Sequence, residues 1–235
     1  TPFDLVGVNF LETMNMPIYK IASFEINDIP LIRYVAKKHK PMIISTGVAD
    51  LDDIQLALDT CYKEGNYDIS LLKCTSEYPA TYEQANLLTI PDMIHRFGIP
   101  VGVSDHTMGS LVPIVAVSLG ATIVEKHFIL SRTNGGPDSA FSMEPNEFRE
   151  MVDSIRNVER ALGNVKYDIT DYQRGKRRSL YARTDIHCGD VFTDQNVGSY
   201  RPGVGLSPQY WDQIMGKTCK REIVKGDVLR QEDLK

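Results

Sequence analysis

The chain has 235 residues, of which 42% are hydrophobic and 24% charged, and its formal net charge is −5. This length exceeds the roughly 100–150 residues of a typical domain, so we expect one large domain or two unequal ones. No apolar run approaches the ~20 residues needed to cross a bilayer, and no leader pattern opens the chain, which argues against a membrane partner. The mild negative charge without a basic stripe argues against a nucleic-acid partner.

Two features of the chain bear on its origin and location. Thr1-Pro2-Phe3 runs directly into an apolar-periodic segment, which predicts that an upstream part is missing. The four cysteines are widely scattered and show no CxxC spacing. Such thiols are typical of a reducing compartment, so the expected location is cytoplasmic.

Five apolar runs without alternation predict parallel strands that helices cover on both faces. They are residues 18–23, 41–46, 69–75, 100–104 and 121–126. Between them, the apolar spacing of 3, 4 and 3 from Leu51 to Cys61 predicts a helix, with Asp50 as its N-cap. Helices are also expected over 110–120 and over 146–162, the latter ending at Gly163.

This alternation predicts an α/β fold. Its rhythm matches a (β/α)8 TIM barrel, in which about 250 residues divide among eight units. Only about five of the eight units are present, so the prediction is a partial barrel. A doubly wound open sheet is the alternative, but no Gly-x-Gly-x-x-Gly follows the first strand.

The character of the chain changes after Gly163. Residues 164–178 are polar and charged and are interpreted as a solvated linker. From Ser179 the elements shorten, and Ile186-x-x-Gly-Asp-Val-Phe192 recurs as Ile223-x-x-Gly-Asp-Val-Leu229. We therefore expect a barrel portion over 1–163, a linker over 164–178, and a small, β-rich, pseudo-symmetric domain over 179–235.

His106 and His127 each close one of two consecutive predicted strands. Both imidazoles would then emerge at the carboxyl edge of the sheet, where α/β folds place their active sites. Neutral imidazole is the commonest nitrogen ligand for divalent metals, so one hypothesis is a two-histidine metal site. The other is that both are hydrogen-bonded structural residues, and spacing alone leaves the two open.

Several motifs together resemble the sialic acid synthases. They are Lys20-Ile-Ala-Ser-Phe-Glu25, Lys73-Cys-Thr-Ser-x-Tyr-Pro79, Gly102-Val-Ser-Asp-His-Thr107, Glu125-Lys-His-Phe128 and Gly136-Pro-Asp138. The tail, from Arg177-Arg-Ser-Leu180 through Arg201-Pro-Gly203, resembles the antifreeze-like (SAF) domain of that family. Residues 135–142 and 74–76 are most similar to the pseudaminic acid branch, with the neuraminic and legionaminic branches as rivals.

The resemblance implies an enzyme that condenses phosphoenolpyruvate with an N-acetylated amino sugar to a nine-carbon 2-keto acid and releases phosphate. It implies that His106 and His127 hold a divalent metal, with Mn²⁺ expected and Mg²⁺ or Co²⁺ as alternatives. The positions matching those that hold phosphoenolpyruvate are Thr1, Lys20, Ser23, Ser76 and Ser104. Ser76 departs from the asparagine common in neuraminic acid synthases.

The residues that match the sugar-facing positions are Glu25, Tyr78, Asp138 and Arg201, and Glu25 is the expected acid/base. In the family the arginine comes from the other subunit of a domain-swapped homodimer. The family's first strands also supply a glutamate, a lysine and a glutamine that have no counterpart here. We therefore expect an incomplete site and no turnover by this chain alone.

Two alternatives of other classes remain at this point. A carbohydrate-binding or assembly module could keep the barrel without catalysis, although the retention of His106, His127, Lys20 and Glu25 argues against it. A Rossmann-type oxidoreductase is more distant, because the chain lacks a dinucleotide-binding glycine pattern.

Overall fold

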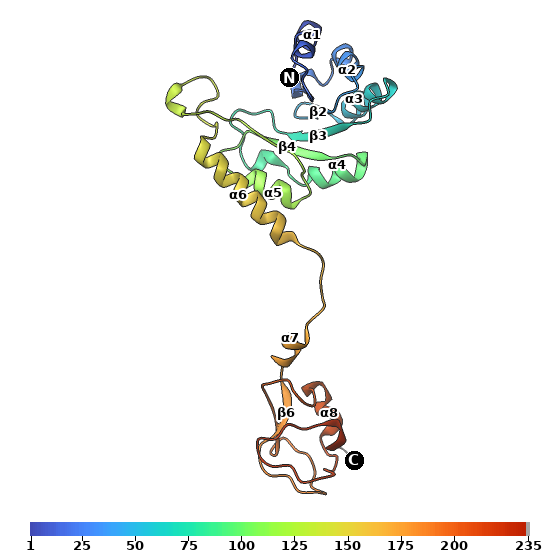
Figure 1. The fold of residues 1–235 in the computed structure, drawn as a ribbon, viewed down its shortest axis with the longest axis vertical. Helices are drawn as coiled ribbons and strands as arrows, with labels where there is room; N and C mark the ends of the chain where they lie inside the picture. Colours follow the sequence, from blue (N-terminus) through green and yellow to red (C-terminus); the bar gives the residue numbers. More distant parts are fainter. Residues whose placement is uncertain (234–235) are drawn as a thin grey trace. The chain divides into compact units, whose positions relative to one another are not determined.

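The computed structural model describes residues 1–233 and divides the chain into two compact units, Thr1–Gly163 and Asn164–Lys235 (Figure 1). Each unit has its own hydrophobic core. Within the described residues, no helix is long and apolar enough to span a membrane.

Unit 1 is built on one curled parallel sheet with the order β1-β2-β3-β4-β5. Its strands are β1 (Tyr19–Ile21), β2 (Met42–Ser45), β3 (Ile69–Cys74), β4 (Val101–Asp105) and β5 (Val124–Lys126). Helix α1 (Leu5–Thr13) precedes the sheet, and the helices between and after the strands are α2 (Ile29–Ala36), α3 (Leu51–Lys63), α4 (Thr89–Phe97), α5 (Leu111–Ser118) and α6 (Pro145–Leu162). The prediction of a partial TIM barrel is confirmed.

The core of unit 1 lies between the outer face of the sheet and the helices. Ile44, Leu71 and Val103 are almost fully buried there, against α2, α3 and α4 side chains such as Val35, Leu58 and Ile90. Since side chains alternate along a strand, the intervening residues face the barrel interior. The strands thus present an apolar face to the helices and a polar one, examined below, to the interior.

Strand and helix ends differ from the expected ones for local reasons. The first strand stops at Ile21, because Ser23–Glu25 turns into a 3₁₀ helix. Asp50 caps α3 as predicted, and its carboxylate accepts the Asp53 N–H in a reciprocal capping box. Leu162, in the last turn of α6, is 55% exposed and lies outside the core, whereas Met151 and Ile155 of that helix are buried.

Unit 2 is small and contains an antiparallel pair, β6 (Ser179–Ala182) and β7 (Val197–Tyr200). Its helices are α7 (Asp171–Gly175) and α8 (Trp211–Ile214). The expected linker 164–178 is therefore not wholly irregular: α7 forms within it, and Thr170 caps this helix in a box with Gln173.

The internal repeat of unit 2 has a structural basis. Ile186 and Ile223 exchange both backbone hydrogen bonds at 2.9 Å, so the two copies meet each other at this pair. The Gly189 N–H bonds the Cys219 carbonyl, and the matching Gly226 N–H bonds the Ala182 carbonyl. Both glycines have positive φ, +95° and +93°, which is the backbone conformation that favours glycine in a turn. The pseudo-symmetry read from the sequence is confirmed.

Candidate active site

A pocket of about 440 Å³ opens at the carboxyl edge of the unit 1 sheet. Seven of the residues expected to bind substrate or metal line it: Thr1, Lys20, Ser23, Tyr78, Ser104, His106 and His127. They come from β1, β4 and the segments that follow β1, β3, β4 and β5, together with the start of the chain. The fold thus brings into one cavity residues that are more than 100 positions apart in sequence.

Strand register explains this convergence. Cys74, Ser104 and Glu125 are register partners across β3, β4 and β5, and they share the interior face. Lys20 projects from β1 to the same interior, where its Nζ lies 3.1 Å from Glu125 Oε1. The Ser104 hydroxyl donates to the same carboxylate oxygen at 2.7 Å. One ammonium, one hydroxyl and one carboxylate therefore form the floor of the pocket.

The two histidines lie side by side at the rim, with ring centroids 5.1 Å apart. His106 Nδ1 is 2.7 Å from the Thr75 carbonyl oxygen, which accepts its proton and leaves Nε2 as the nitrogen with a free lone pair. His127 Nδ1 lies 3.5 Å from Asp138 Oδ2. The sequence prediction that both imidazoles emerge at one sheet edge is confirmed.

The two imidazoles have different proton affinities. Burial would lower the pKa of His106, but hydrogen bonds with the Cys74 thiol and the Thr75 carbonyl outweigh it and raise the pKa. Burial, and then the neighbouring His106, lower the pKa of His127. His127 is therefore the more readily neutral of the two, which is the form that coordinates a metal.

Small polar side chains gather at the loop after β2. The Gly47 N–H donates to Ser23 Oγ at 3.1 Å. A Cβ on Gly47 would lie 2.2 Å from Ser76 Oγ and 2.9 Å from Ser23 Oγ. Only glycine therefore lets these two hydroxyls approach the backbone at position 47. Ser45 lines the pocket, and its buried Oγ has no hydrogen-bond partner among the described residues. Ser76 does not line the pocket.

Cys74 lies among these groups. Burial tends to raise the pKa of its thiol, but hydrogen bonds with His106, Ser23 and Ser104 together outweigh burial and bring the pKa down to about 7. The thiol is 3.8 Å from Ser76 Oγ. Cys74 is thus part of the polar network that surrounds His106, and the sequence analysis assigned it no role.

Aromatic rings form one wall beside the histidines. The Tyr78 ring centroid lies 4.3 Å from that of His106 and 6.0 Å from that of His127, and the Phe141 centroid lies 5.0 Å from that of His127. Asp138 is next to this group because its carboxylate contacts His127. Glu25 does not line the pocket, and its buried Oε2 has no hydrogen-bond partner among the described residues.

Arg201 belongs to unit 2 and lines a separate pocket of about 370 Å³. Two further basic residues, Arg183 and Lys225, line it together with Tyr181 and Tyr200. The Arg183 guanidinium donates to the Asp194 carbonyl. The Arg201 guanidinium makes no hydrogen bond or ion pair with any residue that the structure describes.

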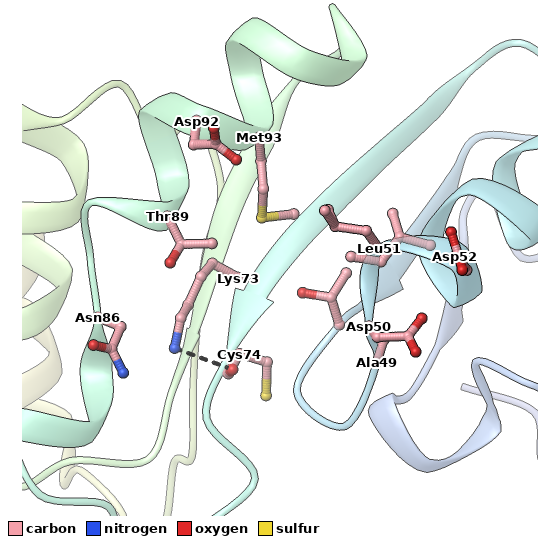
Figure 2. A pocket seen from close by; sticks show the side chains of 12 residues that line it. Ala49, Asp50, Leu51, Asp52, Lys73, Cys74, Asn86, Thr89, Asp92 and Met93 are labelled. Atoms are coloured by element: carbon pink, nitrogen blue, oxygen red, sulfur yellow. Dashed lines mark hydrogen bonds between the residues drawn. The ribbon is translucent and has the colours of Figure 1, made fainter.

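A second pocket of unit 1 lies elsewhere on the sheet. It measures about 840 Å³ and is lined by the start of α3, by α4 and by Lys73 and Cys74 of β3 (Figure 2). Lys73 shares the outer face of β3 with the core residue Leu71, so this pocket opens on the outer side of the sheet. Its lining includes three acidic residues, Asp50, Asp52 and Asp92, against one basic residue, Lys73, so its charge does not favour an anionic substrate.

The donor set at the rim fits a metal with open coordination positions. Two imidazole nitrogens are available at adjacent strand ends, and the Asp138 carboxylate is next to one of them. Over residues 1–233 there is no cluster of three or more His, Cys, Asp or Glu at ligand spacing. The protein part of such a centre would therefore be the histidine pair.

Sequence reasoning missed Glu125, Ser45, Gly47 and Cys74. Glu125 and Cys74 stand within motifs that were noted, but their importance depends on cross-strand register. A carboxylate inside an apolar strand was the available signal for Glu125. No local signal distinguished Ser45 or Gly47.

Comparison with known families agrees with this geometry. Residues 1–167 match the model of the NeuB family, and residues 177–235 match that of the SAF domain. The chain belongs to the NeuB family. The resemblance to the sialic acid synthases inferred from its motifs is confirmed.

Particular relatives refine the comparison. Pseudaminic acid synthase of Campylobacter jejuni strain NCTC 11168 is 42% identical over 236 residues, covering 99% of this chain and 69% of that protein. N,N'-diacetyllegionaminic acid synthase of the same strain is 36% identical, covering 98% of this chain and 71% of that protein. The crystal structure of the spore coat polysaccharide biosynthesis protein SpsE of Bacillus subtilis matches with a TM-score of 0.67 and 32% identity, covering 100% of this chain and 72% of that one.

Proposed function

We propose that this protein is a pseudaminic acid synthase, which condenses phosphoenolpyruvate with an N-acetylated amino sugar. The observation that carries the proposal is the interior pocket that holds Lys20, Ser104 and the histidine pair together. Identity supports the choice of branch, because it is 42% with a pseudaminic acid synthase and 36% with a legionaminic acid synthase of the same strain.

The pocket floor is suited to a small polyanion. Phosphoenolpyruvate carries a phosphate and a carboxylate, and charge-assisted hydrogen bonds to such groups are about twice as strong as neutral ones. Lys20 supplies the charge, and Ser23, Ser104 and Thr1 supply further donors. Ser76, whose Oγ lies beside Gly47, is proposed as a further donor, although it does not line the pocket. Without substrate, Glu125 is the partner of Lys20.

His106 and His127 would hold the metal, with Mn²⁺ as the proposed ion and Mg²⁺ or Co²⁺ as alternatives. When bound, the metal supplies Lewis-acid polarisation of the sugar aldehyde. His106 is oriented for this role by its Nδ1–H bond to Thr75, which presents Nε2 to the pocket. The lowered pKa of His127 keeps its imidazole in the ligand form at neutral pH.

The proposed reaction balances as follows. A carbon–carbon bond forms between C3 of phosphoenolpyruvate and the aldehyde carbon, and water adds at C2. The aldehyde oxygen takes up the proton that the water loses. The C2–O bond to phosphate then breaks, C2 becomes the ketone, and the proton of its hydroxyl leaves with the phosphate. Three carbons join six to give the nine-carbon 2-keto acid. Glu25 is proposed to move the proton, and Tyr78, Asp138 and Arg201 to contact the sugar. Preorganised charges of this kind are a large source of catalytic stabilisation.

The test is a comparison of substrates. We expect the chain with Mn²⁺ and phosphoenolpyruvate to bind the amino-sugar precursor of pseudaminic acid at least about tenfold more tightly than the precursors of legionaminic and N-acetylneuraminic acids, a difference of about 1.4 kcal/mol. Titration calorimetry measures this, with His106→Ala/His127→Ala as the control that should lose sugar binding. Equal affinity for all three sugars would contradict the pseudaminic assignment.

The same mixtures should be assayed for phosphate release and product mass. Turnover by this chain would support the reaction and overturn the expectation that its site is incomplete. Sugar binding with unchanged metal content in the double-alanine variant would instead favour a non-catalytic carbohydrate-binding relative. The cytoplasmic location and the homodimer stay predictions.

A further inference from the structure

A row of three charged side chains lies behind the histidine pair. Lys73, Asp105 and Lys126 stand at the carboxyl ends of β3, β4 and β5; we call them the outer charge row. Asp105 and Lys126 have side chains only 1% exposed, and Lys126 Nζ is 2.5 Å from Asp105 Oδ2. The proposed reaction uses none of the three.

Strand geometry ties this row to the histidines. Asp105 and Lys126 are register partners, and they directly precede His106 and His127 in the chain. Because side chains alternate along extended backbone, the ion pair and the imidazoles project to opposite sides of the same two strand ends. The ion pair therefore links the two chain segments on the outer side of the sheet, and the same segments carry the imidazoles on the inner side.

The backbone that follows β4 is tied to the same pair. The Thr107 N–H donates to Asp105 Oδ1 at 2.9 Å, and the Thr107 carbonyl accepts from Lys126 Nζ. His106, which lies between Asp105 and Thr107, is thus held on both sides. A well-packed apolar pair would stabilise the fold as well or better, since burying two charges costs desolvation energy. The arrangement accordingly suits orientation more than stability.

Lys73 contacts the segment that contains Thr75, whose carbonyl is the hydrogen-bond acceptor of His106. Its Nζ donates to Thr75 Oγ1 at 2.7 Å and to the Cys74 carbonyl at 3.2 Å, the latter drawn as a dashed line in Figure 2. The Thr75 carbonyl is the acceptor for His106 Nδ1. Lys73 therefore holds the short segment that orients the His106 ring.

We propose that Asp105, Lys126 and Lys73 are positioning residues that set the spacing and ring orientation of the histidine pair for metal binding. This inference rests on the proposed function, in which those histidines hold the metal. Groups that orient metal-ligating histidines typically contribute about 10–100-fold to metal affinity, and the outer charge row is expected to fall in this range.

The experiment removes the buried charges as a pair. Asp105→Asn/Lys126→Met keeps an acceptor for Thr107 and the length of the lysine stem. Its matched control is Glu12→Gln/Lys40→Met, which neutralises a 2.7 Å ion pair elsewhere in unit 1. Mn²⁺ affinity is measured by titration calorimetry on the whole chain, and the urea midpoint of unfolding is measured in parallel.

We expect Mn²⁺ affinity to fall by about 10–100-fold in the Asp105/Lys126 variant and to stay unchanged in the control. Parental Mn²⁺ affinity in the Asp105/Lys126 variant, or an equal loss of affinity in this variant and in the Glu12/Lys40 control, would overturn the inference and leave the proposed function standing. If the parent chain binds no Mn²⁺, the metal part of the proposed function fails and the inference with it. If the double variant does not fold, Lys73→Met decides: weakened Mn²⁺ binding supports the inference, and unchanged binding overturns it.

Discussion

Single polar side chains in otherwise apolar strands define the chemistry of unit 1. Lys20 and Glu125 would each be costly to bury alone, and their 3.1 Å contact offsets part of that cost. Their side chains remain 19% and 38% exposed, so the pair stays accessible to a ligand. An anion that enters the pocket would compete with Glu125 for Lys20, which makes Lys20 the most direct residue to test.

Replacing Lys20 by methionine should weaken phosphoenolpyruvate binding. Hydrogen bonds to charged groups contribute about 1.5–3 kcal/mol, which corresponds to an affinity loss of roughly 10–150-fold. Titration calorimetry with phosphoenolpyruvate measures the loss, and Lys63→Met, at the exposed end of α3, controls for the change in net charge. Equal affinity in the Lys20 and Lys63 variants would show that Lys20 does not hold the substrate.

Some residues of the site could be predicted from the sequence. His106, His127 and Lys20 were predictable because each breaks an apolar run at or near a strand end. Glu125 breaks an apolar run in the same way, but its partners Lys20 and Ser104 follow from cross-strand register, and Ser45 carries no local signal at all. The residues next to these positions in the sequence give no information about such contacts.

At the scale of elements, β4 and β5 matter most because the histidines extend from them. All five residues of β4 are buried, and Gly102 is the second of them. A Cβ on Gly102 would lie 2.4 Å from the Ile123 carbonyl oxygen, 2.6 Å from Ile123 Cβ and 2.7 Å from Leu72 Cδ2. The first of these atoms is backbone, so the segment leading into β5 would have to move.

Gly102→Ala should therefore destabilise unit 1. Overpacking of this kind costs about 1–3 kcal/mol in the free energy of unfolding. Urea denaturation measures the change, and Gly175→Ala serves as the control, because a Cβ there meets no atom within 4 Å. If both variants unfold at the parental urea concentration, the close approach of Gly102 to Ile123 is not a constraint on the sheet.

Elements were predicted well in kind and less well in extent. The five strands and the long helix α6 follow from mainly apolar runs and from helical spacing, which are local properties. Their ends depend on tertiary contacts: β1 gives way to the 3₁₀ turn at Ser23–Glu25, and Leu162 stays exposed because no core lies beneath the last turn of α6. The short helix α7 arose where polar composition predicted only a linker.

At the scale of the whole molecule, each of the two units carries residues that the family resemblance assigns to the sugar site. Unit 2 presents Arg201 in a basic, tyrosine-lined pocket. Family resemblance predicts that this arginine contacts the sugar at the site of a partner subunit. A homodimer with twice the 26.4 kDa chain mass is then expected, and light scattering measures it.

Arg201→Ala should weaken sugar binding by roughly 10–150-fold, the loss of one charged hydrogen bond, while Mn²⁺ and phosphoenolpyruvate binding stay at parental values. Mixing Arg201→Ala chains with His106→Ala/His127→Ala chains should restore sugar binding in hybrid dimers, since each hybrid would hold one intact site. A monomeric chain, or mixtures without restored binding, would contradict an arginine shared across subunits.

The sequence by itself determined the partial barrel, the pseudo-symmetric second unit and the family, because apolar periodicity, turn glycines and motif order are written along the chain. Only the tertiary structure decided that Lys20 pairs with Glu125, that the Ser23 and Ser76 hydroxyls both lie close to Gly47, and that a buried ion pair lies behind the histidines. These contacts join strands far apart in sequence. They depend on register and on the curl of the sheet, which arise only when the whole unit packs.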